Sequence, residues 1–304
     1  MKIGYIGFGK MGLNQALRLK EQGIEIVGFN RSEDGKIKAR EAGIEVKNSI
    51  KEMCENLGVS SLSSRIIWIM VSHQGVDEVL KELYQNLNRG DIIIEGGNSF
   101  YKESIRRAKE AEGLGFEFLD AGVSGGPSGA RNGACIMVGG KKEIFEKCEE
   151  IFKKASAPNA YKYFGISGAG HFVKMVHNGI EYGMMQAIGE GFEVLKKSEF
   201  NLNLKEVSEI YQNKSVVESR LVGWLHDGFE KFGEELVGIS GEVSHSGEGE
   251  WTVNTARELN VPVRVIEDSL EFRINSTGNP SFTGKVLSTM RTMFGGHEVR
   301  SEHL

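Results

Sequence analysis

Four side chains with acid–base or hydrogen-bonding chemistry fall close together in the second half of the chain. They are Lys174, His177, Asn178 and Glu181, at offsets of 0, 3, 4 and 7 residues. On a helix this spacing places all four within an arc of roughly 100°. A solvated helix face would instead carry repeated Lys/Glu pairs along its whole length. We therefore expect a reactive polar stripe that lines a water-filled cleft, because burying unpaired charges is costly.

The stripe needs a long helix to carry it. Between His171 and Lys197 the sequence has no proline and no cluster of polar loop residues, which predicts one continuous helix. Its remaining positions are mostly apolar, so this helix is expected to be largely buried. Further helical patterns follow at residues 204–211, 215–228, 232–239, 249–259 and 263–272. The second half of the chain is therefore predicted to be all-helical.

The first half of the chain alternates short apolar runs with amphipathic helical patterns. The apolar runs are expected to be strands, at residues 2–6, 25–29, 65–71, 91–95, 116–120, 135–138 and 161–164. This alternation predicts an α/β domain, a doubly wound parallel sheet with helices on both faces. A chain of 304 residues has room for about two domains. We place a dinucleotide-binding domain at 1–166 and a helical substrate and oligomerisation domain at 167–304.

The turn after the first expected strand reads G-F-G-K-M-G and matches the pattern G-x-G-x-x-G. Such a pattern is weak evidence in a chain with 40 glycines, but here it follows a strand and opens a helix. These glycines permit a tight turn and let a pyrophosphate approach the helix N-terminus, as in a Rossmann-like domain. The alternative is a tight turn without a ligand. The expected cofactor contacts are Gly7, Gly9, Lys10, Met11 and Gly12.

The end of the second expected strand bears on the choice between NAD and NADP. An acidic residue at this point would bind the ribose 2′-hydroxyl, but the chain has Asn30, Arg31 and Ser32. A guanidinium and a hydroxyl suit a 2′-phosphate, so NADP is the expected cofactor. NAD is the alternative, with Glu33 or Asp34 binding the ribose.

Two other strand ends carry groups that could bind an anionic ligand. In an open parallel sheet, ligands bind beyond the carboxyl ends of the strands. One expected strand ends in E-G-G-N-S and another in D-A-G-V-S-G-G. Hydroxyl, amide and free N–H groups there could hold a carboxylate or a phosphate, although either segment could also be an ordinary loop.

Composition excludes several classes of function. The net charge of −5 argues against a nucleic-acid partner. The longest apolar run, Ile66 to Val71, is too short to cross a membrane. Cys54, Cys135 and Cys148 lack the spacing of a metal or redox motif, so they are expected to be reduced thiols in the core of a cytoplasmic protein. No metal site is expected.

Six segments, taken in order, resemble the decarboxylating 6-phosphogluconate dehydrogenases. The specific one is the run GAGHFVKMVHNGIEY at 168–182, which is long and chemically mixed. The other segments are 7–14, 95–99, 122–131, 251–252 and 294–297. The chain length is similar to the short branch of that family, which lacks the extended helical repeat of longer members.

The resemblance implies a reaction and its residues. Lys174 is similar to the general base that removes the C3 hydroxyl proton while hydride leaves C3 for the nicotinamide. Glu181 is similar to the acid that protonates C1 after CO2 is lost, giving ribulose 5-phosphate in the pentose phosphate pathway and gluconate metabolism. Such a base must be neutral, so the pKa of the lysine would fall from about 10.4 toward 7–8. The β-keto group serves as electron sink, so this step needs no metal.

The resemblance also implies ligands for the sugar-acid phosphate and a homo-oligomer. The expected substrate contacts are Asn98, Ser124, Gly125, Gly126, His177, Asn178, Tyr182, Arg273, Arg291 and His297, and Asn98 also contacts the cofactor. In the family the C-terminal tail reaches into the neighbouring subunit's site. Arg291 and His297 therefore imply a homodimer or homotetramer whose tails complete the neighbour's site.

Two features depart from the family pattern. Glu250 stands before Trp251 where the family usually has a phosphate-binding lysine. This glutamate could point away, could pair with Arg273 or Arg291, or could mean that the substrate lacks the phosphate. In addition, short members of the family often prefer NAD, whereas the Asn30–Ser32 segment resembles the pattern of the longer, NADP-binding members.

Two other functions are compatible with parts of the pattern. The related β-hydroxyacid dehydrogenases, such as 3-hydroxyisobutyrate dehydrogenase, share the glycine pattern but not the H-N-G-I-E-Y continuation. A non-catalytic NADP(H)-binding sensor would need a broken site, yet Lys174, Asn178 and Glu181 are all in place.

Overall fold

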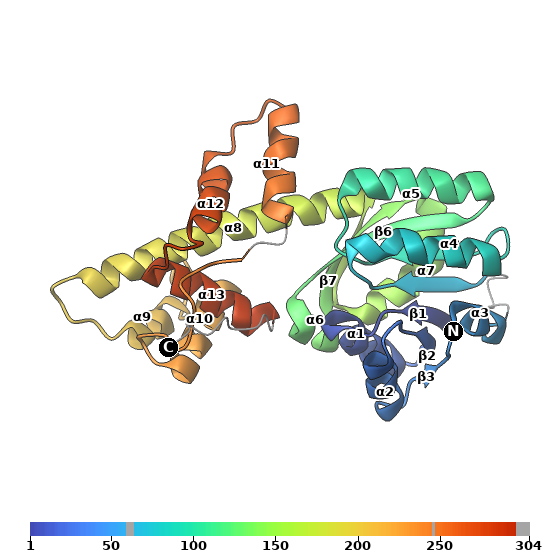
Figure 1. Ribbon diagram of the computed structural model, residues 1–304, viewed down its shortest axis with the longest axis horizontal. Coiled ribbons are helices and arrows are strands. Elements are labelled where there is room, and N and C mark those ends of the chain that lie inside the picture. Colours follow the sequence, from blue (N-terminus) through green and yellow to red (C-terminus); the bar gives the residue numbers. More distant parts are fainter. Residues whose placement is uncertain (59–63, 245–246, 296–304) are drawn as a thin grey trace. The chain divides into compact units, whose positions relative to one another are not determined.

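The computed structural model describes residues 1–58, 64–244 and 247–295 (Figure 1). The chain divides into two units, Met1–Lys174 and Met175–Leu304, and each is described by itself. The division falls inside a helix rather than in a loop. The domain ranges 1–166 and 167–304 stay predictions.

The first unit is built on a sheet whose eight strands lie in the order β3-β2-β1-β4-β5-β6-β7-β8 in the described residues. The strands are β1 (Lys2–Ile6), β2 (Glu25–Phe29), β3 (Glu45–Val46), β4 (Ile66–Ile69), β5 (Ile92–Glu95), β6 (Glu117–Ser124), β7 (Ala134–Gly140) and β8 (Ser156–Gly165). The chain order reverses between β1 and β4, which makes this the switch point where such sheets bind ligands. The predicted doubly wound sheet is confirmed, with one difference: β7 runs antiparallel to β6.

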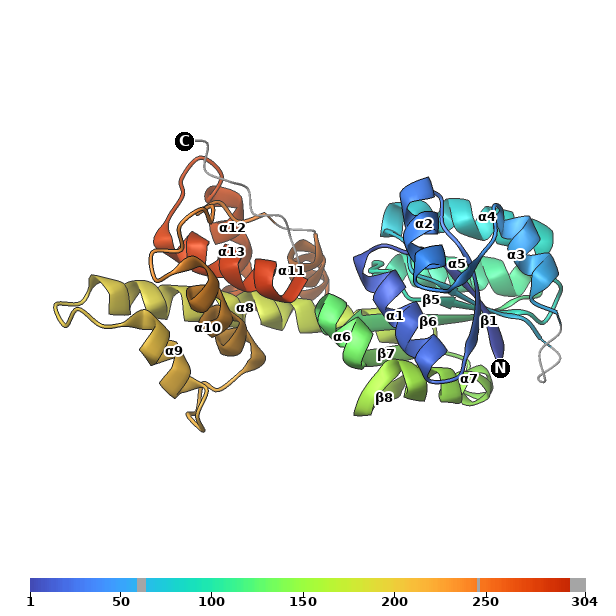
Figure 2. The ribbon, with the colours of Figure 1, turned by 90° about the horizontal axis from the view of Figure 1, so that it is seen from below.

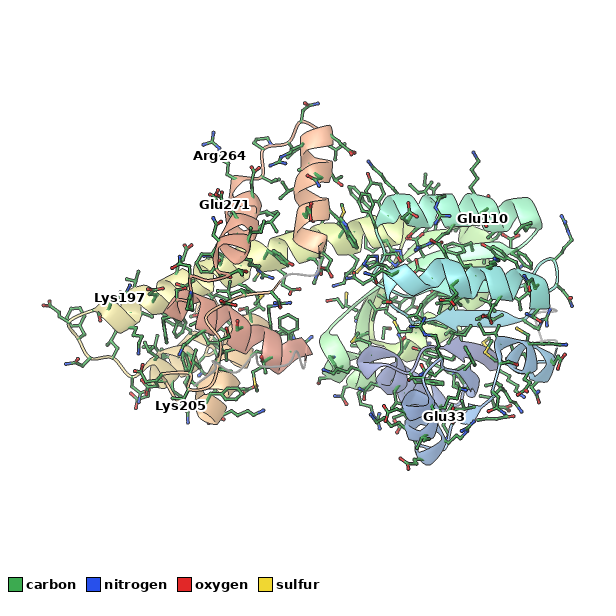
Figure 3. All side chains as sticks on the ribbon, viewed as in Figure 1. Glu33, Glu110, Lys197, Lys205, Arg264 and Glu271 are labelled. Carbon is green, nitrogen blue, oxygen red and sulfur yellow. The ribbon has the colours of Figure 1, made fainter. Side chains whose placement is uncertain are left out.

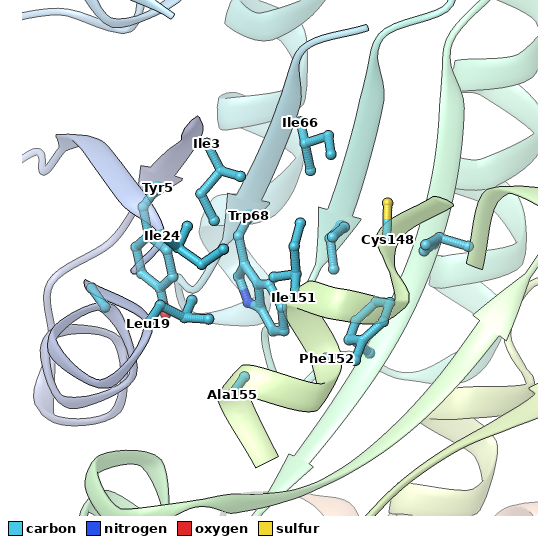
Figure 4. Packing of buried hydrophobic residues seen from close by; sticks show 14 of the residues in the cluster. Ile3, Tyr5, Leu19, Ile24, Ile66, Trp68, Cys148, Ile151, Phe152 and Ala155 are labelled. Carbon is cyan, nitrogen blue, oxygen red and sulfur yellow. The ribbon is translucent and has the colours of Figure 1, made fainter. Parts of the chain in front are cut away.

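Helices cover the sheet through two separate apolar clusters. The first cluster joins the sheet to α1 (Lys10–Glu21), α2 (Glu33–Glu41) and α7 (Lys142–Ala155), and the second joins it to α3 (Ile50–Asn56), α4 (Val76–Asn86) and α5 (Tyr101–Leu114). Figure 4 shows the first cluster, where Trp68 of β4 lies against Ile151 and Phe152 of α7. The α7 segment buries apolar residues three and four positions apart, so its sequence dictates which face meets the sheet.

Two smaller elements complete the first unit. The 3₁₀ turn η1 (His73–Gly75) precedes α4. The short helix α6 (Gly126–Asn132) follows β6 and packs beside α1, as both views of the ribbon show (Figure 1, Figure 2).

The second unit is helical in all its described elements. They are most of α8 (Ala169–Lys197), then α9 (Leu204–Tyr211), α10 (Arg220–Phe232), α11 (Glu248–Glu258), α12 (Arg264–Asn275) and α13 (Phe282–Gly295). Met185 and Phe192 of α8 share a core with residues of α9, α10 and α13. The predicted helical region is thereby confirmed. No described helix has the length and apolarity needed to span a membrane.

Three local expectations are wrong. The helix expected at 232–239 is absent: α10 ends at Phe232 and residues 233–238 form turns, because Gly233, Leu236 and Gly238 adopt positive φ angles that a helix cannot accommodate. The helix expected from 215 begins only at Arg220, because the Ser219 side chain accepts the Val222 N–H and caps it there. Cys135 is exposed and not in the core, since it points away from the sheet face of its buried neighbours.

Candidate active site

The glycine loop of the first unit has the geometry that a dinucleotide needs. Gly7 has φ +103°, and a Cβ on Gly12 would lie 2.0 Å from the Gly7 carbonyl oxygen, so both positions require glycine. A Cβ on Gly9, by contrast, would meet open space. Gly9 directly precedes α1 and, having no side chain, leaves the first turn of the helix without a side-chain cap. A pyrophosphate can therefore approach the unsatisfied N–H groups of the first turn of α1.

Asn30 ties this loop to the end of β2. Its Oδ1 accepts the backbone N–H of Phe8 at 2.8 Å, and its Nδ2 donates to Ser32 Oγ at 3.0 Å. Ser32 in turn caps α2 by accepting the Gly35 N–H. Asn30 and Ser32 thus lie beside the glycine loop, where the adenosine ribose of a dinucleotide binds in this fold.

The charged residues at this corner favour an anionic ligand group. The Arg31 side chain is 86% exposed and lies 3.4 Å from Glu78 of α4, a weak surface contact that solvent screens. Glu33, at the start of α2 in Figure 3, pairs with Lys36 and Arg40. Hydrogen bonding from Lys36 is the main cause that lowers the pKa of the Glu33 carboxyl.

Asp34 is likewise paired within α2, where its Oδ2 lies 2.7 Å from Lys38 Nζ. The two acids that could have bound a ribose are therefore engaged with cations of their own helix. This arrangement suits a 2′-phosphate beside Arg31 better than it suits a ribose hydroxyl.

The ends of β5 and β6 supply the second group of candidate residues in this unit. Asn98 is exposed in the loop after β5, and Ser124 is the last residue of β6. Gly125 and Gly126 follow with φ +122° and +64°, so the chain turns sharply into α6 through conformations that favour glycine.

Lys174 belongs to the first unit and packs against β6. It is 9% exposed, and a Cβ on Gly122 would lie 2.4 Å from the Lys174 Cβ. Partial desolvation of the Cys135 thiol raises its pKa, and the charge of Lys174 acts against that rise. Because Cys135 is the strand partner of Ser124, the structure brings Lys174 and Ser124 to the same part of the sheet.

Asp120 positions the start of α8, and it was not among the predicted site residues. Its two carboxylate oxygens accept the N–H of Gly168 at 2.6 Å and the N–H of His171 at 2.8 Å. Asp120 is fully buried at the end of an otherwise apolar stretch of β6. A carboxylate at that position is the signal that could have marked it, because buried acids are normally paired.

The second unit holds the other residues of the polar stripe. His177 Nδ1 lies 3.0 Å from Asn178 Oδ1 and 3.9 Å from Glu181 Oε2. Asn178 is buried, while His177 and Glu181 are partly exposed. Within this single chain Ile180 and Met184 are 53% and 44% exposed, so the expected burial of the helix is wrong at these two positions.

Two buried arginines form a cationic cluster in the second unit. Arg273 and Arg291 are 1% and 7% exposed. The Arg273 guanidinium lies 3.4 Å from the centre of the Tyr182 ring, and Arg291 donates to Ser244 Oγ at 2.7 Å. Gly249 makes room for Tyr182, since a Cβ there would lie 2.5 Å from its ring.

The electrostatics of this cluster favour an anion. The pKa of Arg273 is lowered to about 10, mainly by burial and in smaller part by the charge of Arg291, while Tyr182 and Glu181 oppose this. Burial also lowers the pKa of Arg291, although Tyr182, Glu248 and Glu181 oppose this. A guanidinium keeps its charge in proteins, so these are two buried cations, and the neighbouring Tyr182, Glu181 and Glu248 offset the cost of burying them only in part. A phosphate, which guanidinium groups bind through paired hydrogen bonds, would supply the missing charge.

Glu250 does not join the arginine cluster. It is exposed in the first turn of α11, whereas Arg273 and Arg291 are buried. The first of the three explanations, that Glu250 points away, fits this exposure best. Glu248, two residues earlier, is buried and acts on Arg291 instead.

His297 lies outside the described residues. Over residues 1–58, 64–244 and 247–295, no group of three His, Cys, Asp or Glu side chains that could hold a metal ion is found. The expectation of a metal-free reaction stays a prediction.

Two family models match consecutive parts of the chain. The NAD binding domain of 6-phosphogluconate dehydrogenase matches residues 2–168, and the C-terminal domain of 6-phosphogluconate dehydrogenase matches residues 170–289.

Two relatives match the chain over almost its whole length. YqeC of Bacillus subtilis, named as a candidate 6-phosphogluconate dehydrogenase, is 45% identical over 99% of this chain and 100% of its own. A Haloferax volcanii protein named as an NAD(+)-dependent, decarboxylating 6-phosphogluconate dehydrogenase is 37% identical over 98% of each chain.

Solved structures give the same result for the fold. The 6-phosphogluconate dehydrogenase of Plasmodium falciparum, whose structures include complexes with NADP+ and with 6-phosphogluconate, matches with a TM-score of 0.78 at 30% identity. It covers 91% of this chain, and this chain spans 62% of its length. The 3-hydroxyisobutyrate dehydrogenase of Mycobacterium tuberculosis has a TM-score of 0.72 at 17% identity over 95% of this chain, a likeness of fold alone.

Proposed function

The chain belongs to the 6-phosphogluconate dehydrogenase family, and from this premise we propose that it oxidises 6-phosphogluconate and releases ribulose 5-phosphate and CO2. The observation that carries the substrate assignment is the pair of buried arginines, Arg273 and Arg291, whose charge their own surroundings compensate only in part. A phosphate dianion is a natural partner for two such guanidiniums. Tyr182, stacked under Arg273, fixes the orientation of that guanidinium.

Each proton has an assigned residue in this mechanism. Lys174 takes the proton of the C3 hydroxyl while the C3 hydride passes to the cofactor, and the product is a 3-keto acid. The C1–C2 bond then breaks, C1 leaves as CO2, and the electron pair moves into an enediolate over C2 and C3. Glu181 delivers a proton to this former C2, which becomes C1 of ribulose 5-phosphate. We propose that the sugar hydroxyls and the carboxylate are bound by seven residues: Asn98, Ser124, Gly125, Gly126, His177, Asn178 and His297.

We propose NADP as the preferred cofactor, with NAD as the alternative. The nicotinamide, when bound, accepts the hydride. The open space above Gly9 would accommodate the pyrophosphate, and Arg31 with Ser32 would hold the 2′-phosphate. The engagement of Glu33 and Asp34 by cations of α2 supports this choice.

We further propose that the protein works in the cytoplasm as a homodimer or homotetramer whose C-terminal tails, with His297, complete a neighbour's site. Arg291 was also expected there, but it is buried in its own chain beside Arg273. Four apolar side chains left exposed on α8 and α12 support an interface between subunits: Ile180, Met184, Val265 and Ile274.

Product analysis tests the proposed reaction. Incubation with 6-phosphogluconate and each nicotinamide should yield reduced cofactor, CO2 and ribulose 5-phosphate in equal amounts. Lys174→Met should abolish all three while cofactor still binds, since the glycine loop is untouched. Hydride transfer without CO2 would instead indicate a β-hydroxyacid dehydrogenase. Cofactor binding without turnover of the native protein would indicate a sensor.

A further inference from the structure

A second buried carboxylate, Glu95, lies at the end of β5 beside the candidate site. It is fully buried and is the register partner of Asp120 on β6. Its Oε1 accepts the Gly97 N–H at 3.0 Å and the Ser99 hydroxyl at 3.1 Å. Asn98 stands between these two residues. Glu95 therefore fixes the loop that presents Asn98, one of the proposed ligands of substrate and cofactor.

The other oxygen of Glu95 faces two basic side chains. Glu95 Oε2 lies 3.6 Å from Arg107 Nη1 and 3.6 Å from His171 Nδ1, distances that allow attraction without a direct hydrogen bond. Arg107 is 3% exposed, donates to Ser99 Oγ at 2.9 Å and pairs with Asp77. The loop is thus held from both sides, by Glu95 and by Arg107.

His171 connects this cluster to the first turn of α8. Its ring Nδ1 lies 2.7 Å from the Ser104 hydroxyl of α5, and its backbone N–H donates to Asp120. His171 is 1% exposed, and Lys174 follows one turn later on the same helix. The imidazole therefore lies where the ends of β5 and β6 meet the helix that carries the proposed base.

Two buried polar atoms of the cluster have no hydrogen-bond partner in the described part of the chain. They are Glu95 Oε2 and His171 Nε2. Such atoms cost stability, and an apolar pair could fill the same space at lower cost. Groups kept at a cost to stability are typical of functional sites.

We propose that Glu95 and His171 are positioning residues for hydride transfer: together they hold the Asn98 loop and the Lys174 turn of α8 in fixed relation within the first unit. The inference rests on the proposed function, since it assigns Lys174 as the base and Asn98 as a ligand. A small displacement of Asn98 or Lys174 would lengthen the distance that the C3 hydride or proton must travel. Such a misplacement strongly lowers the reaction rate.

The test compares two amide substitutions, one at the end of β5 and one just before it begins. Glu95→Gln keeps an acceptor for the loop N–H but removes the charge that faces Arg107 and His171. The matched control is Asp91→Asn, which weakens the buried pair of Asp91 with Arg65, 2.7 Å apart, just before β5 begins. Each variant is titrated with cofactor to count binding sites, and kcat and KM for 6-phosphogluconate are measured per site.

We expect Glu95→Gln to lower kcat per site at least tenfold, with KM and cofactor Kd changed less than about twofold, the signature of an interaction made in the transition state. With substrate deuterated at C3, the isotope effect on kcat should be larger than in the native enzyme, because hydride transfer becomes more rate-limiting. Asp91→Asn should lower the thermal midpoint but leave kcat per site and the isotope effect unchanged.

A purely structural role predicts a different result. If Glu95→Gln lost binding sites but kept native kcat and isotope effect per site, the proposal would be overturned. Should Glu95→Gln not fold, Ser104→Ala removes the hydrogen bond to His171 and a long one, 3.5 Å, to the Phe100 carbonyl. This variant should lower kcat per site at least threefold with the same isotope signature. Native kcat in that variant would equally overturn the proposal. Failure of the native enzyme to turn over 6-phosphogluconate would refute the proposed function itself.

Discussion

The substitution Glu181→Gln tests whether Glu181 donates the proton that C1 of ribulose 5-phosphate receives. Glu181→Gln keeps the size of the side chain but removes the acidic proton intended for C1, so kcat should fall at least tenfold while cofactor Kd stays the same. The control is Glu190→Gln on the exposed side of the same helix, which should keep native turnover. Full turnover by Glu181→Gln would show that another group protonates C1.

Arg31 should set the choice of cofactor. Arg31→Asp would place a carboxylate beside the 2′-phosphate, so the ratio of kcat/KM for NADP over NAD should fall at least tenfold, about 1.4 kcal/mol. Arg89→Asp makes the same charge change in an exposed turn before β5 and should leave the ratio unaltered. A native preference for NAD would refute this role and direct attention to Glu33 and Asp34.

Residue types and spacing predicted the polar stripe of α8 because helix geometry is local. They did not predict that Arg31 meets Glu78, or that Glu95 faces His171, because these pairs join residues 47 and 76 positions apart. Such contacts depend on which strands are neighbours. Glu95 and Asp120 could have been recognised as candidate site residues, because each is an acid at the end of an expected apolar strand.

The turn between β1 and α1 should tolerate a methyl group at Gly9 in the fold but not in cofactor binding. Gly9→Ala adds a methyl group into open space, so the fold and thermal midpoint should be preserved. The methyl group would occupy the expected place of the pyrophosphate, so cofactor Kd should rise at least tenfold. Gly113→Ala, also in open space but within α5, should bind cofactor normally and gain up to about 1 kcal/mol of stability.

If Gly9→Ala bound NAD and NADP with native affinity, the pyrophosphate would have to bind elsewhere. Fluorescence titration with each reduced cofactor measures this directly.

Strands and helices with strong periodicity were predicted well, and the errors have identifiable causes. Apolar runs cannot reveal strand direction, so the antiparallel β7 was not foreseen. The apolar residues Phe232, Leu236 and Ile239 have the spacing of a helical face, which led to the wrong prediction. Positive φ angles at Gly233 and Gly238 instead produce turns in this segment. α13 was not predicted at all, although Val286, Leu287 and Met290 bury its apolar face.

At the scale of the whole molecule, the proposed sharing of sites between subunits predicts complementation. Lys174→Met and His297→Ala should each be inactive. After subunit exchange, a mixed oligomer should contain sites with a native helix from one subunit and a native tail from the other, so activity should return. A mixture of Lys174→Met with Glu181→Gln is the control, since both changes affect the same helix and no mixed site is intact. Absence of rescue in the first mixture, with exchange verified, would mean that each site is built within one chain.

We propose a phosphorylated sugar acid as the substrate, and Glu250 is the residue that argues against this assignment. The most direct measurement is kcat/KM of the native enzyme for 6-phosphogluconate and for gluconate under the same conditions, with CO2 release followed. Because Arg273 and Arg291 are buried cations that a phosphate would compensate, we expect the ratio to exceed about one hundred, or roughly 2.7 kcal/mol. A ratio at or below one would contradict the substrate assignment, even if the chemistry of Lys174 and Glu181 were retained.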